Sequence, residues 1–355
     1  MRITLFIDAL HGGGAQRQMA IMANLFYKYG HDVSVVTHSS LKDDYELHPN
    51  IKRIRLEQGQ GRVGTWFNIF KYFNGDNFDV VISFISTKLM LLSLLFRRKK
   101  NIKIIVGERC QGSTTQEMMH NLYKYADYIV PNSIAQWADL CAMRPDWKHK
   151  IVAIGNYMDL TYYTPTPLPN CTQVRIAIFA RYQKEKNCQR FLTAVKLLKE
   201  SCSTPFRIDW YGHHCLGSQY EEEYVKAAAY VQENGLQEVV NLNNRATDAR
   251  KCIAEYDCLC LPSLREGFAN TIAEGICCGR PILASDVSDN GIMVKNGVNG
   301  FLFDPTDEES ICSALKQFIE LPVVEREKMG VASRVLAEQL FDEEKFVNQY
   351  ISLMR

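Results

Sequence analysis

The sequence lacks the long apolar run that a membrane-spanning helix needs, since no stretch reaches about 18 uninterrupted apolar residues. Its first residues, Met1-Arg-Ile-Thr-Leu-Phe-Ile, are too short an apolar run for a signal peptide. Twelve cysteines are scattered without the paired spacings of a zinc site or a secreted disulfide scaffold. These absences argue against a membrane-spanning, zinc-ribbon or disulfide-stapled protein, and we expect a protein of the reducing cytoplasm.

Several ligand-binding signatures are also missing. The glycine-rich segment His11-Gly-Gly-Gly-Ala-Gln-Arg17 has neither the spacing of a dinucleotide fingerprint nor a P-loop lysine. There is no Asp-x-Asp-type pair of metal ligands, no tandem repeat and no low-complexity segment. We therefore expect neither a bound cofactor nor a catalytic metal.

The composition is that of an ordinary globular protein: of the 355 residues, 46% are hydrophobic and 23% are charged. A chain of this length exceeds the size at which one core keeps growing, so we expect two domains of about 150–200 residues. The net charge is only +1, but it is unevenly spread. Residues 1–155 hold 20 Lys and Arg against 13 Asp and Glu, and residues 156–355 hold 21 against 27.

The basic first half is suited to an anionic partner, either a negatively charged membrane face or an acceptor that carries phosphate. Its densest basic run, Phe96-Arg-Arg-Lys-Lys100, directly follows the apolar run Leu89–Leu95. One interpretation is a helix seated on a membrane with a basic edge. The other is a buried helix whose C-terminal cations favour its dipole. Nothing indicates a nucleic-acid partner.

Strand and helix patterns alternate along the whole chain. The expected strands are Ile3–Ile7, Val33–Thr37, Ile51–Leu56, Val80–Phe84, Ile102–Val106, Tyr128–Asn132, Ile151–Ile154, Val174–Phe179, Arg207–Tyr211, Val239–Leu242, Asp257–Leu261, Ile282–Ala284 and Phe301–Phe303. Such alternation implies parallel sheets. Three prolines within residues 161–170 mark a linker between the two series.

The domain organisation follows from these patterns. We expect a first Rossmann-like domain over residues 1–160, a second over 161–340, and a cleft between the two facing domains. The final segment, residues 341–355, has a helical pattern.

The segment Ser263-Leu-Arg-Glu-Gly-Phe-Ala-Asn-Thr-Ile-Ala-Glu274 carries the most information about chemistry. It follows an apolar strand and places Glu266 in a loop and Glu274 one turn into the next helix. In α/β folds ligands bind where strands end, and a helix N-terminus attracts an anion. The two carboxylates would then grip hydroxyls on either side of that anion, which suits a phosphate flanked by sugars.

This Glu-x7-Glu pattern resembles the retaining glycosyltransferases of family 4, which have the GT-B fold and use nucleotide sugars. The resemblance extends through Asn296-Gly-Val-Asn-Gly-Phe-Leu-Phe-Asp-Pro305. It implies that Glu266 faces the transferred sugar, with backbone groups of Gly267, Phe268 and Ala269, and that Glu274 holds the nucleotide ribose. The helix that begins near Asn270 and Thr271 would receive the diphosphate. The resemblance also implies that the final helix, within residues 341–355, packs back on the first domain.

Two further segments resemble loops of the same family. Ala180-Arg-Tyr-Gln-Lys-Glu-Lys-Asn187 is similar to its Gly-Arg-Leu-x-x-x-Lys-Asn loop, which implies that Arg181 and Lys186 neutralise the donor diphosphate. The segment His11–Arg17 resembles the Gly-Gly-Ala-Glu-Arg turn, with Gln16 in place of the glutamate. That match places Gly13 and Gly14 near the donor phosphates or the acceptor.

A third segment, Val106-Gly-Glu-Arg-Cys110, resembles the Ser-Glu-Arg-Asn turn of members that extend lipid-linked or surface glycans. It implies acceptor contacts by Glu108 and Arg109, with His120 as a nearby candidate. Partners elsewhere in the fold, or a mutual Glu108–Arg109 pair, explain the same residues. Val287-Ser-Asp-Asn-Gly291 departs from the family's Gly-Gly and Pro-Glu donor loop, and Ile154–Asp159 departs from its Pro-Asn-Gly-Val-Asp.

The resemblance implies a retaining, metal-independent hexosyltransferase without a side-chain nucleophile. It would move a hexose or N-acetylhexosamine from a nucleotide diphosphate sugar, expected to be a UDP sugar, to a glycan or polyprenyl-diphosphate-linked acceptor. This activity belongs to cell-surface polysaccharide assembly, such as lipopolysaccharide or capsule, and places the protein in the cytoplasm, peripherally on the inner face of the cell membrane. The alternatives are a nucleotide-sugar epimerase of the same fold and a non-catalytic sugar-nucleotide-binding protein.

Overall fold

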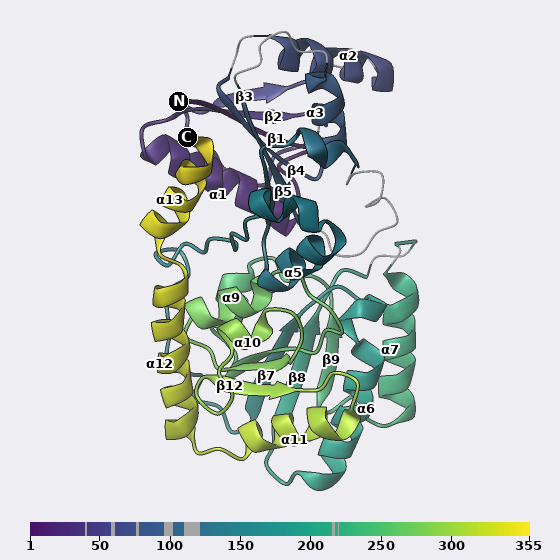
Figure 1. The fold of residues 1–355 in the computed structure, drawn as a ribbon. Coiled ribbons are helices and arrows are strands. Elements are labelled where there is room, and N and C mark those ends of the chain that lie inside the picture. Colours follow the sequence, from purple (N-terminus) through teal and green to yellow (C-terminus); the bar gives the residue numbers. More distant parts are fainter. Residues whose placement is uncertain are drawn as a thin grey trace. The chain divides into compact units, whose positions relative to one another are not determined.

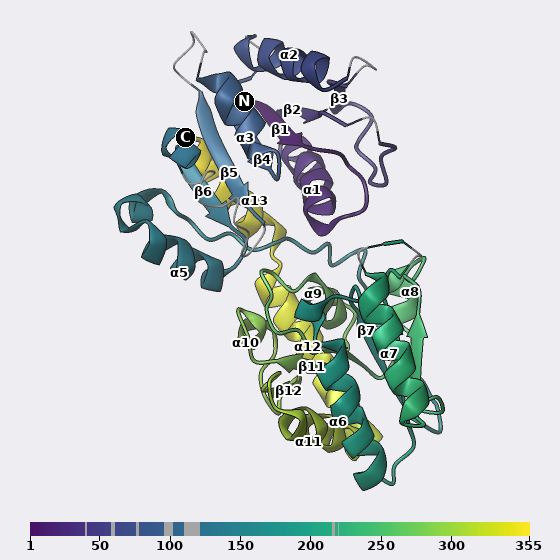
Figure 2. The same ribbon diagram turned by 90° about the vertical axis from the view of Figure 1, so that its right-hand side faces the viewer.

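The computed structural model describes residues 1–39, 41–57, 61–75, 78–95, 102–109, 121–214, 217–218 and 220–355. The basic run at residues 96–100 and the acceptor candidate His120 lie outside these residues. The chain forms two compact units, one made of Met1–Tyr157 with Glu343–Arg355 and the other of Met158–Asp342 (Figures 1 and 2).

The first unit is built on a parallel six-stranded sheet. In the order β3-β2-β1-β4-β5-β6, neighbouring strands pair in parallel. The strands are β1 (Arg2–Ile7), β2 (Asp32–Thr37), β3 (Lys52–Arg55), β4 (Val80–Phe84), β5 (Lys103–Glu108) and β6 (Tyr128–Pro131).

Helices cover both faces of this sheet. They are α1 (Gly14–Lys28), α2 (Gly61–Asn74), α3 (Thr87–Leu94), α5 (Ile134–Met143) and α13 (Glu343–Met354), with 3-10 turns η1 (Tyr123–Tyr125) and η2 (Pro145–Lys150). Alternate residues of each strand point to opposite faces, so Leu5 packs with α1 and α13 while Phe6 packs with α2 and α3. Figure 1 shows α13 returning from the end of the chain to lie beside α1.

The structure decides between two interpretations in this unit and corrects one expectation. Helix α3 belongs to the core, because Met90 and Leu91 are buried among residues of α2 and the sheet. The described part of the apolar run is therefore a packed helix, which agrees with the second interpretation given above. The expected strand at Ile151–Ile154 is reduced to an isolated bridge between Ile129 and Ile151.

The second unit contains another parallel six-stranded sheet, in the order β12-β11-β10-β7-β8-β9. Its strands are β7 (Val174–Phe179), β8 (Phe206–Tyr211), β9 (Val240–Asn243), β10 (Cys258–Leu261), β11 (Ile282–Ser285) and β12 (Gly300–Phe303). Its helices are α6 (Cys188–Ser201), α7 (Glu221–Glu233), α8 (Ala249–Ile253), α9 (Asn270–Cys277), α10 (Asn290–Met293), α11 (Glu308–Ile319) and α12 (Val323–Leu340), with the 3-10 turn η3 (Lys184–Lys186). The two parallel sheets confirm the predicted α/β class.

The proline-rich segment 161–170 is tied to the second unit by a buried arginine. Arg280 is fully buried and donates to the Thr166 and Pro167 carbonyls at 2.7 and 3.1 Å. It also donates to the carbonyls of Ile253 and Ala254 at the end of α8. One guanidinium thus satisfies four backbone carbonyl groups, two of them in a proline-rich segment that does not form a strand.

Each sheet contains one point where the strand order reverses. In the first unit it lies between β1 and β4, and in the second between β7 and β10. In open parallel sheets this switch point leaves a crevice at the carboxyl ends of the strands, where ligands bind. We therefore expect the loops after β7 and β10 to carry the functional site of the second unit.

Candidate active site

Two loops meet at the switch point of the second sheet. The loop after β7 runs from Ala180 to Asn187, and the loop after β10 runs from Pro262 to Ala269. The backbone N–H of Leu264 donates to the Glu185 carbonyl at 2.8 Å and joins them. Because the strands are parallel neighbours, both loops leave the same edge of the sheet.

The joined loops bring Lys186 and Glu266 into direct contact. Lys186 Nζ donates to Glu266 Oε1 at 2.5 Å, although the residues are 80 positions apart. The side chains are 18% and 11% exposed. This ion pair fixes a cation and a carboxylate at one spot, each with further hydrogen-bonding capacity toward a ligand.

Asn187 anchors the loop that carries Lys186. Its backbone is left-handed, with φ 61°, a conformation that asparagine tolerates better than most residues. Its buried side-chain amide donates to the carbonyls of Pro262 and Pro305 at 3.1 and 2.7 Å. The residue therefore begins α6 and fastens three chain segments together.

Ser288 holds the loop that carries Glu266. Its hydroxyl donates to the Glu266 carbonyl at 2.5 Å and lies 3.3 Å from the Glu266 backbone nitrogen. Ser288 has φ 51°, one of three left-handed non-glycine residues among those described. The segment Val287–Gly291 thus contacts the backbone of Glu266, through the Ser288 side chain.

The N-terminus of α9 lies beside the same loops. Its N-cap residue is Ala269, which has no side-chain acceptor for the first-turn amides. Such amides suit an anion, supported by the helix dipole. Thr271 ties the helix start to β7 by donating to the Phe179 carbonyl at 3.1 Å. Glu274 is buried one turn into the helix.

Arg181 follows β7 and is exposed at the surface of this region. Its guanidinium donates to the Tyr220 hydroxyl at 3.0 Å and lies 5.5 Å from the centre of that ring. The contact directs a long cationic side chain without neutralising it. The second unit therefore assembles the positions predicted for the donor site, namely Arg181, Lys186, Glu266, Gly267, Phe268, Ala269, Asn270, Thr271 and Glu274, on two adjoining loops and one helix.

The glycine-rich turn lies in the first unit, between β1 and α1. Gly13 is the N-cap of α1 and Gly14 its first residue, and no side chain caps the helix. A Cβ at Gly13 would lie 2.2 Å from Gln16 Oε1, so a larger residue cannot occupy this position unless Gln16 moves. Gln16 itself donates to Asp8 Oδ1 at 3.2 Å. The Gly12 and Gly13 N–H groups donate to Asp44 and to the His11 carbonyl, so the first-turn amides of α1 from Gly14 onward are the ones at the switch point of the first sheet.

The two described acceptor candidates have partners elsewhere in the first unit. Glu108 is buried and accepts from the Tyr123 hydroxyl at 2.8 Å. Arg109 stacks on the Phe84 ring at 4.0 Å and donates to the Tyr350 hydroxyl at 3.0 Å. Their neighbours are therefore structural groups of the fold, in line with the alternative given above.

Sequence reasoning missed two neighbours of the predicted site. Tyr220 gave no signal, because an isolated tyrosine near a helix start is common. Ser288 lies in the divergent segment Val287–Gly291, where only a required left-handed residue could have drawn attention. Both contacts depend on loops from separate parts of the chain meeting in space.

Residues 173–320 match the protein family described as Glycosyl transferases group 1. An uncharacterized glycosyltransferase of Haemophilus influenzae is 24% identical over 356 residues, covering 96% of both chains. Among solved structures, Anabaena HepE in complex with UDP and glucose superposes with a TM-score of 0.80 at 16% identity, covering 99% of this chain and 98% of that one. The lipopolysaccharide outer core galactosyltransferase WaaB superposes with a TM-score of 0.76 at 19% identity, covering 99% of both. The second half of this chain is thus similar in sequence to group 1 glycosyltransferases, and the whole chain shares the GT-B fold of these solved structures.

Proposed function

We propose that this protein is a glycosyltransferase that moves a hexose or N-acetylhexosamine from UDP to a glycan or lipid-linked acceptor with retention of configuration. The observation that carries the proposal is the contact between Lys186 and Glu266 at the switch point of the second sheet. It sets a phosphate-binding cation directly against a hydroxyl-binding carboxylate. A sugar diphosphate carries these two kinds of group next to each other, because its diphosphate is attached to the anomeric carbon of the hydroxyl-bearing sugar ring.

The donor would bind to the second unit. Arg181 and Lys186 take the diphosphate together with the amides at the start of α9. Glu266 orients the sugar hydroxyls with the backbone of Gly267, Phe268 and Ala269. Glu274 accepts hydrogen bonds from the ribose. Asn187 and Ser288 hold the two loops in place.

The chemical step breaks the bond between the anomeric carbon and the diphosphate oxygen. Negative charge develops on the leaving UDP, and fixed cations aimed at that charge lower the barrier. The acceptor hydroxyl attacks from the face the diphosphate leaves, and its proton passes to a phosphate oxygen. No side-chain nucleophile is needed, and the two cations supply the charge stabilisation that a divalent metal gives in other enzymes.

The acceptor would bind to the first unit. Its surplus of basic residues suits an anionic acceptor, and the start of α1 at Gly14, which has no side-chain cap, offers backbone amides. The similarity to a lipopolysaccharide galactosyltransferase supports a cell-surface glycan as the acceptor. We accordingly propose a polyprenyl-diphosphate-linked or lipid-linked glycan, used at the inner face of the cell membrane.

A donor screen tests this function. The purified chain is incubated with UDP, GDP and ADP sugars, with and without membrane lipid extract, and nucleotide release is measured with and without EDTA. We expect UDP release that requires the extract and persists in EDTA, with an α-linked product from an α-linked donor by NMR.

Other results would reject parts of the proposal. An epimer formed from the donor without acceptor would identify an epimerase. Tight donor binding without turnover on any extract would identify a binding protein. A β-linked product would contradict retention while leaving glycosyl transfer in place.

A further inference from the structure

Helix α2 turns an apolar stripe toward solvent. Val63, Trp66, Phe67 and Phe70 follow the spacing i, i+3, i+4, i+7, which normally marks the face of a helix that packs on a core. Here Val63 is 83% exposed, Trp66 43% and Phe67 60%. The core contacts of α2 come from a different face that carries the buried residues Ile69 and Phe73.

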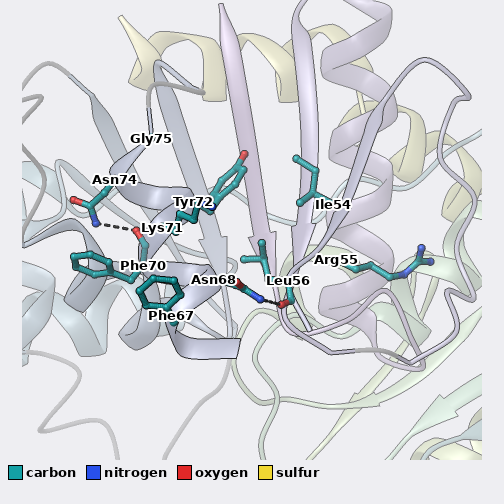
Figure 3. Close-up of a pocket in the computed structure, with 10 residues that line it drawn as sticks. All are labelled: Ile54, Arg55, Leu56, Phe67, Asn68, Phe70, Lys71, Tyr72, Asn74 and Gly75. Carbon is teal, nitrogen blue, oxygen red and sulfur yellow. Dashed lines mark hydrogen bonds between the residues drawn. The ribbon is translucent and has the colours of Figure 1, made fainter. Parts of the chain in front are cut away.

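A shallow pocket of about 680 Å³ lies between this helix and the sheet edge (Figure 3). Phe67 and Phe70 of α2 line it opposite Ile54 and Leu56 of the β3 segment. The remaining lining residues are Arg55, Asn68, Lys71, Tyr72, Asn74 and Gly75. Asn68 donates to the Leu56 carbonyl at 2.9 Å, which ties the helix to the strand. The pocket therefore joins an apolar lining to two cations.

The sequence around this surface is basic. Residues 51–75 contain five Lys and Arg and one acidic residue, Glu57. The carboxylate of Asp43 accepts from both Arg53 and Arg55, at 2.8 and 2.6 Å, so one negative charge faces two positive ones. Lys71 is exposed on α2 close to the apolar stripe. An anionic partner would balance these charges.

We propose that this surface, made of α2 and β3, docks on the interface of an anionic lipid bilayer. Trp66 and Phe67 would enter the headgroup region, where aromatic rings with an apolar body are favoured. Arg55 and Lys71 would meet lipid phosphates. The contact would lie in the interface, because the stripe is a single face of one helix whose other face packs on the core. No helix within the described ranges is long and apolar enough to cross a membrane.

Charge also argues against a second copy of this chain as the occupant. A two-fold interface places the same patch on both sides, and the cations of each copy would then face each other. Like charges brought together across an interface oppose association. An anionic phospholipid surface offers an apolar region for the aromatic side chains of the patch and negative charge for its cations.

The inference rests on the proposed function, since a lipid-linked acceptor is what would bring the enzyme to a membrane. It can still be tested separately, because vesicle binding needs neither donor nor acceptor. If the parent protein fails to bind vesicles but still releases UDP with a water-soluble acceptor, only the docking surface is rejected. Vesicle binding without any transferase activity would reject only the proposed function.

Vesicle flotation of the full chain provides the test, with phosphatidylcholine alone and phosphatidylcholine mixed with phosphatidylglycerol. We expect binding to the mixed vesicles and little to the neutral ones. The double variant Trp66→Ser, Phe67→Ser should weaken binding about tenfold or more, and Lys71→Gln about fivefold. The matched control Val331→Ser, Val335→Ser removes exposed apolar side chains from α12 and should bind like the parent.

The proposal is overturned if the parent protein does not bind the mixed vesicles, or if the double variant binds them as tightly as the parent does. Equal binding to neutral vesicles would remove the role given to the cations. A concentration-dependent dimer that the double variant abolishes, without vesicle binding, would assign the patch to a second copy. Circular dichroism confirms that each variant is folded before binding is compared.

Discussion

At the scale of single residues, the contact between Lys186 and Glu266 explains why two distant motifs belong to one site. The ammonium group is held 2.5 Å from the carboxylate in a partly buried position. In the proposed mechanism, a cation fixed in this way would lose little conformational freedom when the diphosphate binds, and it would already be aimed at the developing charge. The adjacent Lys184, in the same 3-10 turn, is exposed and provides a natural comparison.

The variant Lys186→Ala should lower kcat by about 10²–10³-fold, because one fixed donor to the leaving diphosphate is lost. Steady-state UDP release at saturating donor measures the effect. Lys184→Ala should stay within about twofold of the parent enzyme, as expected for a solvated side chain. Near-parental turnover of Lys186→Ala would remove this residue from the catalytic assignment.

Two variants of Asn187 separate the contribution of its left-handed backbone conformation to stability from that of its side-chain hydrogen bonds. Asn187→Ala loses two hydrogen bonds and forces alanine into the left-handed region, so we expect a cost of about 2–4 kcal/mol in unfolding free energy. Asn187→Gly loses the same bonds without the backbone penalty and should cost about 1 kcal/mol less. Urea denaturation gives both values. Equal losses in the two variants would show that the backbone conformation carries no strain.

At the scale of elements, the loop after β7 is shaped by the strand beside it. Gly212 follows β8, and a Cβ there would lie 2.4 Å from the Ala180 carbonyl oxygen and 2.9 Å from the Tyr182 ring. A backbone oxygen cannot move aside as a flexible side chain can. Any larger residue at position 212 must therefore displace the start of the loop that carries Arg181 and Lys186.

We expect Gly212→Ala to destabilise the protein by about 1–3 kcal/mol and to lower kcat, because the added methyl group pushes on that loop. Gly291→Ala is the control, since the nearest atom to its new Cβ is 3.7 Å away. Urea unfolding and UDP release are measured on both. A Gly212→Ala enzyme with unchanged stability and kcat would mean that the loop adapts without cost.

Elements also show where the sequence patterns were insufficient. Strand positions were predicted well because buried parallel strands are short apolar runs bounded by turns. The run Leu89–Leu95 could be placed either in a membrane or in a core, and packing against α2 decides for the core. Ile151–Ile154 has a strand composition but forms only an isolated bridge to Ile129, and its two backbone hydrogen bonds to β6, from Val152 and Ile154, do not extend into a strand.

At the scale of the whole molecule, each unit has its own hydrophobic core. The C-terminal helix α13 supplies Phe346, Val347 and Tyr350 to the core of the first unit. Phe318 of α11 belongs to the core of the second. Separate cores imply that a mutation in one unit weakens mainly that unit, and that unfolding is not a single two-state transition.

The variant Phe346→Ala should destabilise the first unit by about 3–5 kcal/mol, although it lies near the end of the chain. Hydrogen exchange measured by mass spectrometry should then rise in peptides of β1 and β4. Phe318→Ala should produce the reverse pattern, with faster exchange in β7 and β10. Matching exchange patterns in the two variants would mean that the units unfold together.

The sequence by itself determined the fold class and the positions of the chemical groups. Alternating apolar strands and helices favour parallel sheets, and in such sheets ligands bind at the loops after the strands. Arg181, Lys186 and Glu266 could therefore be placed on such loops in advance, while the roles predicted for them come from the family resemblance. Only the tertiary structure decided which groups touch. Lys186 meets Glu266 because β7 and β10 are neighbours, and strand order is a long-range property that local patterns do not contain.

The same holds for the faces of helices. Both α2 and α3 are rich in apolar residues, and periodicity gives the spacing of a face but not what lies against it. Packing buries α3 and leaves Val63, Trp66 and Phe67 of α2 exposed. The sequence thus determined which side chains share a stripe, and the tertiary structure decided which stripe faces water, because burial depends on neighbours brought from elsewhere in the chain.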